Sequence, residues 1–587
     1  MKKFLLGLLS GFVLAAMAAV ILAFALVRVG DRRQPVPDSS ILTLRLDGAI
    51  PEQAPVTIPL PWFESQAHST VADLWALLHE ASKDDHIKAI LLEPRGLQAG
   101  WAKLDELRRG LERFRKSGKP VYAYLSNPGT REYYLAAAAD KIYFSPEDYL
   151  DVKGLRAELS YYKRTLDKLG VQFEVEHAGA YKDALDSYVR TSATPETRTV
   201  IGSMLDQLFG SFVNAVAAGR KLDAARVKQL VDDGPILNRA ALGGKLIDGL
   251  LYEDQVMDEL KKHIKLPSAG RLNHRDYLAS SAFASEAKTR IALVVGEGAI
   301  TRAGADAEPF SEEEGIRSGP FMRMVKQARE DASIKGVILR VNSPGGDAIA
   351  SDEILHEVRL LAKAKPMVIS MSDLAASGGY YMSMTGDPVV AYPNTITGSI
   401  GVIFGKVNLK GLYEKLGIDT EIMARGKNAD IDTVSRPMSA AGRAKLKEGI
   451  DSTYKAFLDR VAEGRKRKAA EIEPLAQGRV WMGEQAKGNG LVDELGGLDL
   501  ALDLLRKKAK LSATERIQLV PFPRKRTLFD QLFNSADSAR AVAPPAAVLT
   551  RQAVRRGLRE LGLEAIDPEQ WSRGAMLMLP PFTVRFE

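Results

Sequence analysis

A single serine lies between small residues and a glycine pair in the stretch Asp373–Tyr381, which reads DLAASGGYY. The apolar run Met367–Ile369 precedes it, so the pattern predicts a strand, a tight turn and then a helix. This order would place the Ser377 hydroxyl at a helix N-terminus, where the dipole and free N–H groups favour negative charge. A serine that attacks a carbonyl needs that setting, so Ser377 is the candidate nucleophile. No histidine follows His356, so its base is an earlier histidine or another kind of side chain.

A second glycine pair, Gly345–Gly346, follows the apolar run Gly336–Val341 within the sequence NSPGGD. Glycines at a strand end let backbone N–H groups point into a site, because no side chain stands in the way. Together with the N–H group of Gly378, one of them would form an oxyanion hole. Losing one such donor typically costs about 10²–10³ in rate. The alternative role for the pair is a tight turn without chemistry.

Short apolar runs alternate with helical patterns around these motifs. The expected strands are Ile291–Val295, Gly336–Val341 and Met367–Ser370. A helix is expected at Pro320–Asp331, with the proline in the first turn, where its missing N–H is tolerated. Buried strands separated by helices predict an α/β fold with a largely parallel sheet.

The chain contains a tandem duplication. Similar segments recur in the same order, at offsets that drift only from 250 to 245 residues. The matching pairs are Leu46–Ile50 with Gly296–Ile300, Ile87–Leu91 with Ile334–Ile338, Tyr133–Tyr134 with Tyr380–Tyr381, and Gly219–Lys221 with Gly464–Lys466.

The two repeats differ at the residues that carry chemistry. At the offset of the tyrosine pairs, Ser377 corresponds to Thr130, so the first repeat lacks the serine. Lys182 corresponds to Ala429, so the second repeat lacks this lysine. The repeats are therefore complementary, one offering a nucleophile and the other an amine.

The motifs of the second repeat resemble the signal peptide peptidase A family in its long, membrane-anchored, two-copy bacterial form. These motifs are Ser343–Asp347, then Ala376–Tyr381 some thirty residues on, then Thr397–Val402. The resemblance covers the N-terminal anchor, both repeats and the segment between them. It implies that each repeat is a Clp/crotonase-like ββα domain, within an overall α/β fold that also has an N-terminal transmembrane helix.

The resemblance also implies a Ser/Lys dyad with Ser377 as nucleophile and Lys182 as general base, while Ser399 orients the lysine amine. A lysine base must be neutral, although its ordinary pKa is about 10.4 and a useful base has a pKa of about 7–8. Desolvation lowers the pKa of a lysine in this way, so Lys182 is expected to be buried where the repeats meet. Its neighbour Asp183 must then point away, because an ion pair would keep the amine protonated.

Bulk composition is that of a globular protein with several domains. The 587 residues are 45% hydrophobic and 26% charged, with a net charge of +7 that is spread along the chain. A nucleic-acid partner is therefore not expected. The absence of cysteine excludes disulfides, thiolate metal sites and a cysteine nucleophile. The scattered histidines show no metal-binding spacing, and no cofactor is expected.

The segment Phe4–Val27 contains no charged residue and would rise roughly 36 Å as a helix, enough to span a bilayer. A cleavable signal peptide usually has a shorter apolar core of about 7–15 residues. An uncleaved anchor is therefore the expectation, although the basic residues on its two sides are nearly balanced. The simplest topology leaves the short N-terminus in the cytoplasm and exports the rest. With the resemblance, this implies a single-pass protein of the bacterial inner membrane with its body in the periplasm. The resemblance implies a homotetramer that cleaves signal peptides and unfolded segments.

The expected division of the chain follows from these patterns. The parts are a membrane anchor with its flanks (1–33), an N-terminal repeat with the lysine base (34–266), an irregular linker (267–287), a C-terminal repeat with the serine nucleophile (288–512) and a C-terminal extension (513–587). In the extension, apolar residues spaced along Leu528–Phe533 predict a helix that packs on the protein or lies on a membrane. Two alternatives to a peptidase are a catalytically inactive membrane assembly scaffold and a crotonase-type acyl-CoA enzyme.

Overall fold

The structure is a computed structural model that describes residues 35–54, 69–283, 289–302, 315–523 and 577–578. The expected anchor at Phe4–Val27 and the expected helix at Leu528–Phe533 lie outside these residues. Among the described helices only α7 (Pro195–Arg220) is long and apolar enough to cross a membrane. Six of its side chains belong to the hydrophobic core of the first repeat, which is typical of the core helix of a globular body.

The first repeat is built on a six-stranded parallel sheet with the order β8-β4-β3-β2-β1-β9. Its central strands are almost wholly buried, which explains their unbroken apolar sequences. The bounds are β1 Ser40–Asp47, β2 Ile87–Arg95, β3 Val121–Leu125, β4 Lys141–Phe144, β8 Gly249–Leu250 and β9 Gly270–Asn273.

The second repeat reproduces this sheet in the order β20-β16-β15-β13-β10-β21. Two further strands, β17 (Ile396–Gly398) and β19 (Val480–Met482), continue from the far end of β15. The equivalent strands are β10 Thr289–Glu297, β13 Ile334–Ser343, β15 Met367–Ala376, β16 Val389–Ala391, β20 Glu494–Leu495 and β21 Ile517–Phe522. The strands expected at Ile291–Val295, Gly336–Val341 and Met367–Ser370 are confirmed, each somewhat longer than predicted.

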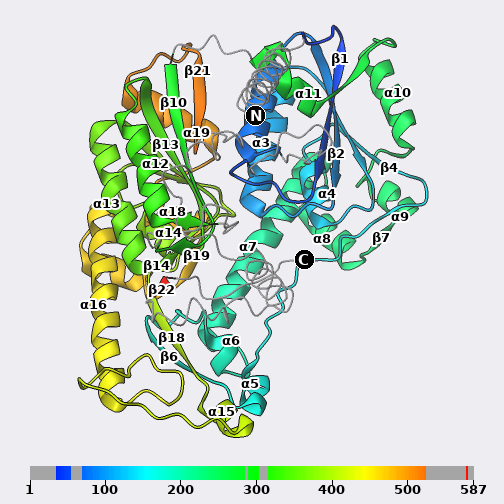
Figure 1. Ribbon diagram of the computed structural model, residues 1–587. Helices are drawn as coiled ribbons and strands as arrows, with labels where there is room; N and C mark the ends of the chain where they lie inside the picture. Colours follow the sequence, from blue (N-terminus) through cyan, green and yellow to red (C-terminus); the bar gives the residue numbers. More distant parts are fainter. Residues whose placement is uncertain (1–34, 55–68, 284–288, 303–314, 524–576, 579–587) are drawn as a thin grey trace, which may run out of the picture.

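Helices pack on both sheets (Figure 1). The expected helix at Pro320–Asp331 is confirmed as α12. In the first repeat the helices are α2 Val71–Lys83, α3 Trp101–Lys116, α4 Thr130–Ala136, α5 Lys163–Leu169, α6 Asp186–Val189, α7 Pro195–Arg220, α8 Ala224–Asp232, α9 Asn238–Gly243, α10 Glu253–His263 and α11 His274–Ala279. In the second they are α12 Ser318–Glu330, α13 Ala348–Ala364, α14 Gly378–Tyr381, α15 Lys410–Leu416, α16 Ala440–Arg465, α17 Ala469–Ile472, α18 Gly483–Asn489 and α19 Leu498–Ala509.

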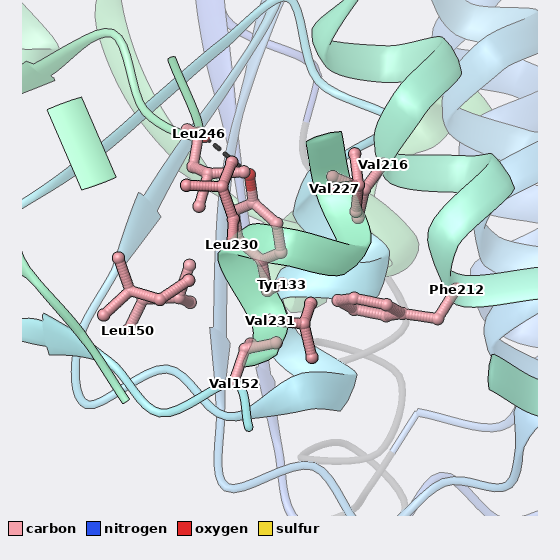
Figure 2. A pocket seen from close by; sticks show the side chains of 10 residues that line it. Tyr133, Leu150, Val152, Phe212, Val216, Val227, Leu230, Val231 and Leu246 are labelled. Atoms are coloured by element: carbon pink, nitrogen blue, oxygen red, sulfur yellow. Dashed lines mark hydrogen bonds between the residues drawn. The ribbon is translucent and has the colours of Figure 1, made fainter. Parts of the chain in front are cut away.

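The duplication extends to individual hydrogen bonds. Figure 2 shows Tyr133 in an apolar pocket of the first repeat, where its hydroxyl donates to the carbonyl of Leu246 at 2.7 Å. Its counterpart Tyr380 donates to the carbonyl of Leu491 at 2.8 Å. Such matched bonds show that both repeats have the same local architecture, so the predicted tandem α/β fold is confirmed for the described residues.

The two repeats are joined by a shared sheet with the order β12-β11-β14-β22-β18-β6. In it β6 of the first repeat pairs antiparallel along the whole of β18 from the second. The bounds are β6 Gln172–Ala178, β11 Ile300–Thr301, β12 Ile316–Arg317, β14 Gly346–Asp347, β18 Val402–Asn408 and β22 Leu577–Met578, and a separate pair is formed by β5 Tyr149–Leu150 and β7 Ile236–Leu237.

A buried polar network also crosses the seam between the repeats. The guanidinium of Arg340 on β13 bonds to both carboxylate oxygens of Glu52 at 3.0 and 3.1 Å, and both side chains are buried. Burial opposes the ionisation of Glu52, but the guanidinium holds the pKa of this carboxyl below its ordinary value. Asp373 on β15 accepts the N–H groups of Gly100 and Lys103, at the start of α3. The strand that leads to Ser377 is thereby tied to the first repeat.

The structure differs from the expectation of an irregular linker at residues 267–287. Within this segment β9 joins the edge of the first sheet beside β1, and α11 follows it. Similarly, the C-terminal extension begins with β21, which pairs with β10 in the equivalent edge position of the second sheet. Both edge strands, β9 and β21, are short and partly polar. Neither therefore has the long apolar pattern that predicts a strand from sequence.

Candidate active site

Ser377 stands at the carboxyl end of β15, where the backbone turns sharply into α14. Its φ of +54° and ψ of −117° are a conformation that side-chain-bearing residues rarely adopt. Two backbone hydrogen bonds hold the turn. The Ser377 N–H donates to the Gly398 carbonyl oxygen at 2.8 Å, and the Ser377 carbonyl oxygen accepts the Tyr381 N–H at 2.8 Å. Strain of this kind costs about 1–3 kcal/mol and is typical of functional sites. The predicted strand–turn–helix setting of the serine is thus present, with a helix of only four residues.

Lys182 reaches this serine from the first repeat, after β6 and just before α6. Its Nζ lies 2.8 Å from Ser377 Oγ, 2.9 Å from Ser399 Oγ and 3.0 Å from the Ser399 carbonyl oxygen. All three residues are fully buried. The structure therefore brings together the three side chains that were expected to cooperate, across 195 positions of sequence.

The lysine has the electrostatic setting of a neutral amine. Burial lowers the pKa of Lys182 well below its ordinary value, and the nearby charge of Asp183 opposes this only in part. The Asp183 carboxylate accepts a hydrogen bond from the hydroxyl of Thr197, near the start of α7, and makes no ion pair with Lys182. Burial raises the pKa of Asp183 itself to about 7. The orientation expected for this carboxylate is present.

A neutral amine has two N–H donors and one lone pair. The carbonyl oxygen of Ser399 can only accept, so it takes one N–H of the amine. The hydroxyl of Ser399 can accept the second N–H, and both contacts therefore hold the amine by its hydrogens. In the neutral state the lone pair is then left facing the hydroxyl of Ser377, which can donate to it. The backbone of Ser399 is bent to allow this, with a φ of +51° and an N–H that donates to Arg479 at 2.8 Å. The carbonyl contact was not foreseen from the sequence, which does not reveal backbone direction.

Glycines of the two expected motifs approach each other beside the serine. A Cβ atom on Gly378 would lie 3.1 Å from the nitrogen of Gly346, and a Cβ on Gly346 would lie 1.9 Å from the Ile300 carbonyl oxygen. The position of Gly346 is therefore restricted to glycine, and its nitrogen lies close to Gly378, the residue that follows Ser377. Gly345 differs from the expectation, because its N–H donates to the Ser343 hydroxyl at 3.1 Å.

Another glycine, which the sequence analysis missed, makes room for the lysine. A Cβ on Gly478 would lie 2.6 Å from the Cβ of Lys182, and its φ of +75° also favours glycine. The N–H of Gly478 donates to the Ile400 carbonyl oxygen at 2.7 Å, and this bond holds the loop that contains Gly478 next to the turn at Ser399. The residue carries no chemistry of its own, so only the close approach in three dimensions reveals it.

The first repeat has a carboxylate at the corresponding corner. Glu132, which aligns with Gly379, accepts the N–H groups of Leu97 at 2.6 Å and Gly129 at 3.1 Å. These donors lie at the end of β2 and before α4, the places equivalent to the end of β13 and the turn at Ser377. The corner therefore binds negative oxygen in the first repeat, where the protein's own side chain fills it. Gly379, at the equivalent position of the second repeat, leaves no room for a side chain, because a Cβ there would lie 2.6 Å from the Ser343 carbonyl oxygen.

Comparison with known proteins agrees with this duplicated architecture. The sequence matches peptidase family S49 over residues 113–267 and again over 359–512. The chain belongs to this family. It is 32% identical over 518 residues to the serine protease SPPA of Arabidopsis thaliana chloroplasts, covering 86% of this chain and 74% of that protein. It is also 32% identical over 496 residues to protease 4 of Salmonella typhi, covering 81% and 78%.

These matches confirm the resemblance to signal peptide peptidase A and the expectation of a serine protease. Among solved structures, ClpP1 from Listeria monocytogenes matches 35% of this chain and 91% of its own, with 15% identity and a TM-score of 0.21. At that score the similarity adds nothing to the assignment. The two family regions cover the C-terminal parts of the two repeats, and the lysine and serine of the site fall one in each.

Proposed function

We propose that this protein is a serine endopeptidase that hydrolyses signal peptides through a dyad of Ser377 and Lys182. The observation that carries the proposal is the buried contact of 2.8 Å between Lys182 Nζ and Ser377 Oγ. Membership of a peptidase family favours hydrolysis over both an inactive scaffold and an acyl-CoA enzyme. One similar protein, from Enterococcus faecium, is named a putative signal peptide peptidase, which supports the substrate class.

In the first half of the reaction, the lone pair of Lys182 takes the proton from Ser377 as Oγ attacks the peptide carbonyl. The oxyanion that develops is stabilised by the N–H groups of Gly346 and Gly378, a role that the close approach of Gly378 to the Gly346 nitrogen supports. The C–N bond then breaks, and the protonated lysine gives its proton to the leaving amine. An acyl-enzyme on Ser377 is left.

In the second half, water enters and attacks the acyl carbonyl. Lys182 takes a proton from this water and returns it to Ser377 Oγ as the ester bond breaks. Ser399 holds the amine in place throughout through its hydroxyl and its carbonyl. The lysine begins and ends each half-reaction neutral, which is the state that its burial favours.

The substrate is proposed to bind as an extended strand beside β14. Support comes from β22, which lies antiparallel on β14 with Met578 opposite Gly346, and which also pairs with Ile403 of β18. A peptide in that place would have its backbone next to the proposed oxyanion donor and to the strand that follows Ser399. A backbone ladder of this kind accepts many sequences, with specificity left to alternate side chains.

The proposed setting is the bacterial inner membrane, with a single N-terminal span and the catalytic body in the periplasm. The uncharged run Phe4–Val27 supports the anchor, and an anchored body suits substrates that are released in the membrane. A homotetramer is proposed on the resemblance to the family.

Cleavage of a synthetic signal peptide by the full-length protein in detergent micelles tests this function. Mass spectrometry should find internal cleavage products with the wild type and none with Ser377→Ala. Ser203→Ala, a half-buried serine on α7 whose hydroxyl bonds to its own helix, is the matched control and should retain full activity. Equal cleavage by wild type and Ser377→Ala would refute the proposed nucleophile.

A further inference from the structure

One residue of the second repeat, Gln477, binds the backbone of the segment that carries Lys182. The Tyr181 N–H donates to the carbonyl oxygen of Gln477 at 2.8 Å, and the Ala180 N–H donates to its side-chain oxygen at 3.3 Å. A Cβ on Gly179 would lie 2.4 Å from the carbonyl carbon of Gln477, so the two segments touch without room for a side chain. The three residues that precede the proposed base are thus all in contact with Gln477.

Gln477 has a left-handed backbone conformation, with a φ of +55°. A residue with a side chain adopts this conformation at a cost, and such residues are enriched at functional sites. The corresponding residue of the first repeat is Asp233, which precedes Gly234 and β7 as Gln477 precedes Gly478 and β19. The φ of Asp233 is −82°, which is ordinary. The left-handed turn therefore belongs to the repeat that receives the lysine and is not required by the shared fold.

Hydrogen bonds with two further side chains hold Gln477 in this conformation. The Gln477 N–H donates to the hydroxyl of Tyr454 at 3.2 Å, and that hydroxyl donates to Glu473 Oε1 at 3.1 Å. The side-chain amide N–H of Gln477 donates to the same Glu473 oxygen. An ionised carboxylate only accepts hydrogen bonds, so Glu473 faces the amide nitrogen, and the amide oxygen is left to accept the Ala180 N–H.

The loop that begins at Gln477 also reaches the other partner of the amine. The Ser399 N–H donates to the carbonyl oxygen of Arg479, two residues after Gln477, at 2.8 Å. Tyr454 lies on α16 and packs against the apolar cluster that joins this helix to β6 and β18. The buried members of this cluster are Ala178, Val402, Phe404, Leu446 and Ile450. One loop thus binds both the Lys182 segment and the Ser399 turn, and α16 holds that loop in place.

We infer that Gln477 is a positioning residue for Lys182, whose segment it holds at the distance that the contacts with Ser377 and Ser399 require. The inference rests on the dyad proposed above and adds to it a residue that acts through the lysine. Misplacing a reacting group by about 1 Å can lower a rate by roughly 10²-fold. The 2.8 Å contact between Lys182 Nζ and Ser377 Oγ is therefore expected to depend on Gln477.

A β-branched residue at this turn tests the inference in the full-length protein in detergent micelles. Gln477→Val disfavours the positive φ and removes the amide. It should lower kcat for a synthetic signal peptide by about 10²-fold with little change in KM, and it should slow fluorophosphonate labelling of Ser377 by a similar factor. Lys510→Val is the matched control, because Lys510 ends α19 with the same φ of +55° and is exposed. The control should lower the thermal midpoint through the same strain, with kcat unchanged.

Milder variants keep the test independent of folding. Gln477→Gly preserves the left-handed turn and the bond to Tyr181 but loses the side-chain bonds, so it should lower kcat by about tenfold. Glu473→Ala should have an effect of similar size, because it removes the acceptor that orients the amide. Glu473→Gln keeps an oxygen that can accept from both Tyr454 and Gln477, and it should therefore retain most of the wild-type kcat.

The labelling rate separates this inference from the proposed chemistry. If Lys182→Met is labelled far more slowly than the wild type while Gln477→Val and Gln477→Gly are labelled at the wild-type rate, the dyad stands and the positioning role is overturned. An equal loss of kcat in Lys510→Val would also overturn it, since the effect would then be general strain. If Lys182→Met is labelled at the wild-type rate, the dyad fails and the positioning role fails with it.

Discussion

Lys182 Nζ lies 2.8 Å from Ser377 Oγ, although the two residues belong to different repeats of the chain. Neither repeat alone contains both groups, because Thr130 and Ala429 stand at the equivalent positions. The geometry of the site is therefore fixed by the contact between repeats. The shared sheet and the buried Arg340–Glu52 pair are parts of that contact.

The stability of the protein should depend strongly on the charge of Arg340 at the contact between the repeats. Arg340→Met is expected to destabilise the protein by about 3–5 kcal/mol, because it leaves a buried carboxylate without its partner. Adding Glu52→Met removes that carboxylate and should recover part of the loss. Thermal unfolding at pH 7 measures both. A single variant as stable as the wild type would show that the pair does not hold the repeats together.

Asp183→Asn should move the acid limb of the pH–rate profile to lower pH. The Asp183 carboxylate raises the pKa of Lys182, so removing its charge favours the neutral amine. The effect should be largest above pH 7, where Asp183 is ionised, since its own pKa is about 7. The measurement is kcat/KM against pH. Asp167→Asn, whose carboxylate is paired with Lys163 at 2.7 Å on α5, is the control with an unshifted limb. A shift to higher pH would contradict the assignment of the base.

The sequence predicted the candidate reactive side chains of this site better than the residues that surround them. Ser377 was identified from the small residues and glycines around it, whereas Lys182 was assigned from the family resemblance and from the absence of a later histidine. One N–H group of the pair Gly345–Gly346 was expected to serve the site, and that of Gly345 donates instead to a hydroxyl two residues earlier in the chain. Gly478 and the carboxylate of Glu132 act through contacts between distant segments. Such contacts leave no periodic pattern, so sequence analysis does not find them.

Gly346→Ala should lower kcat by about 10²–10³ with a smaller change in KM, because the displaced N–H no longer faces the oxyanion. The added Cβ would lie 1.9 Å from the Ile300 carbonyl oxygen, so β14 must move. Steady-state kinetics with a peptide substrate give both constants. Gly202→Ala on α7, where a Cβ meets no atom within 4 Å, is the matched control. An unchanged kcat in Gly346→Ala would remove Gly346 from the site.

Lys182→Met should abolish activity and raise the thermal midpoint at pH 7. The folded pKa of Lys182 lies below its unfolded value, so the unfolded chain binds more protons and stability rises with pH between the two values. At pH 7 the buried neutral lysine therefore lowers the free energy of unfolding, and methionine at this position does not. Each kcal/mol that is regained raises the thermal midpoint by roughly 2–4 °C for a domain of this size.

The gain should shrink as the pH approaches 10, where the unfolded lysine also loses its proton. Lys406→Met is the matched control, since this buried lysine is paired with Glu174 at 3.3 Å and its loss should destabilise the protein. A lower midpoint for Lys182→Met at pH 7 would indicate that the lysine is charged in the folded protein.

The most direct test is the rate at which a fluorophosphonate modifies Ser377, measured against pH in the wild type and in Lys182→Met. If the amine of one repeat activates the hydroxyl of the other, the wild-type rate rises with pH and levels off well below the ordinary pKa of lysine. The variant then reacts far more slowly at every pH. Equal rates for the two proteins would contradict a site assembled across the seam.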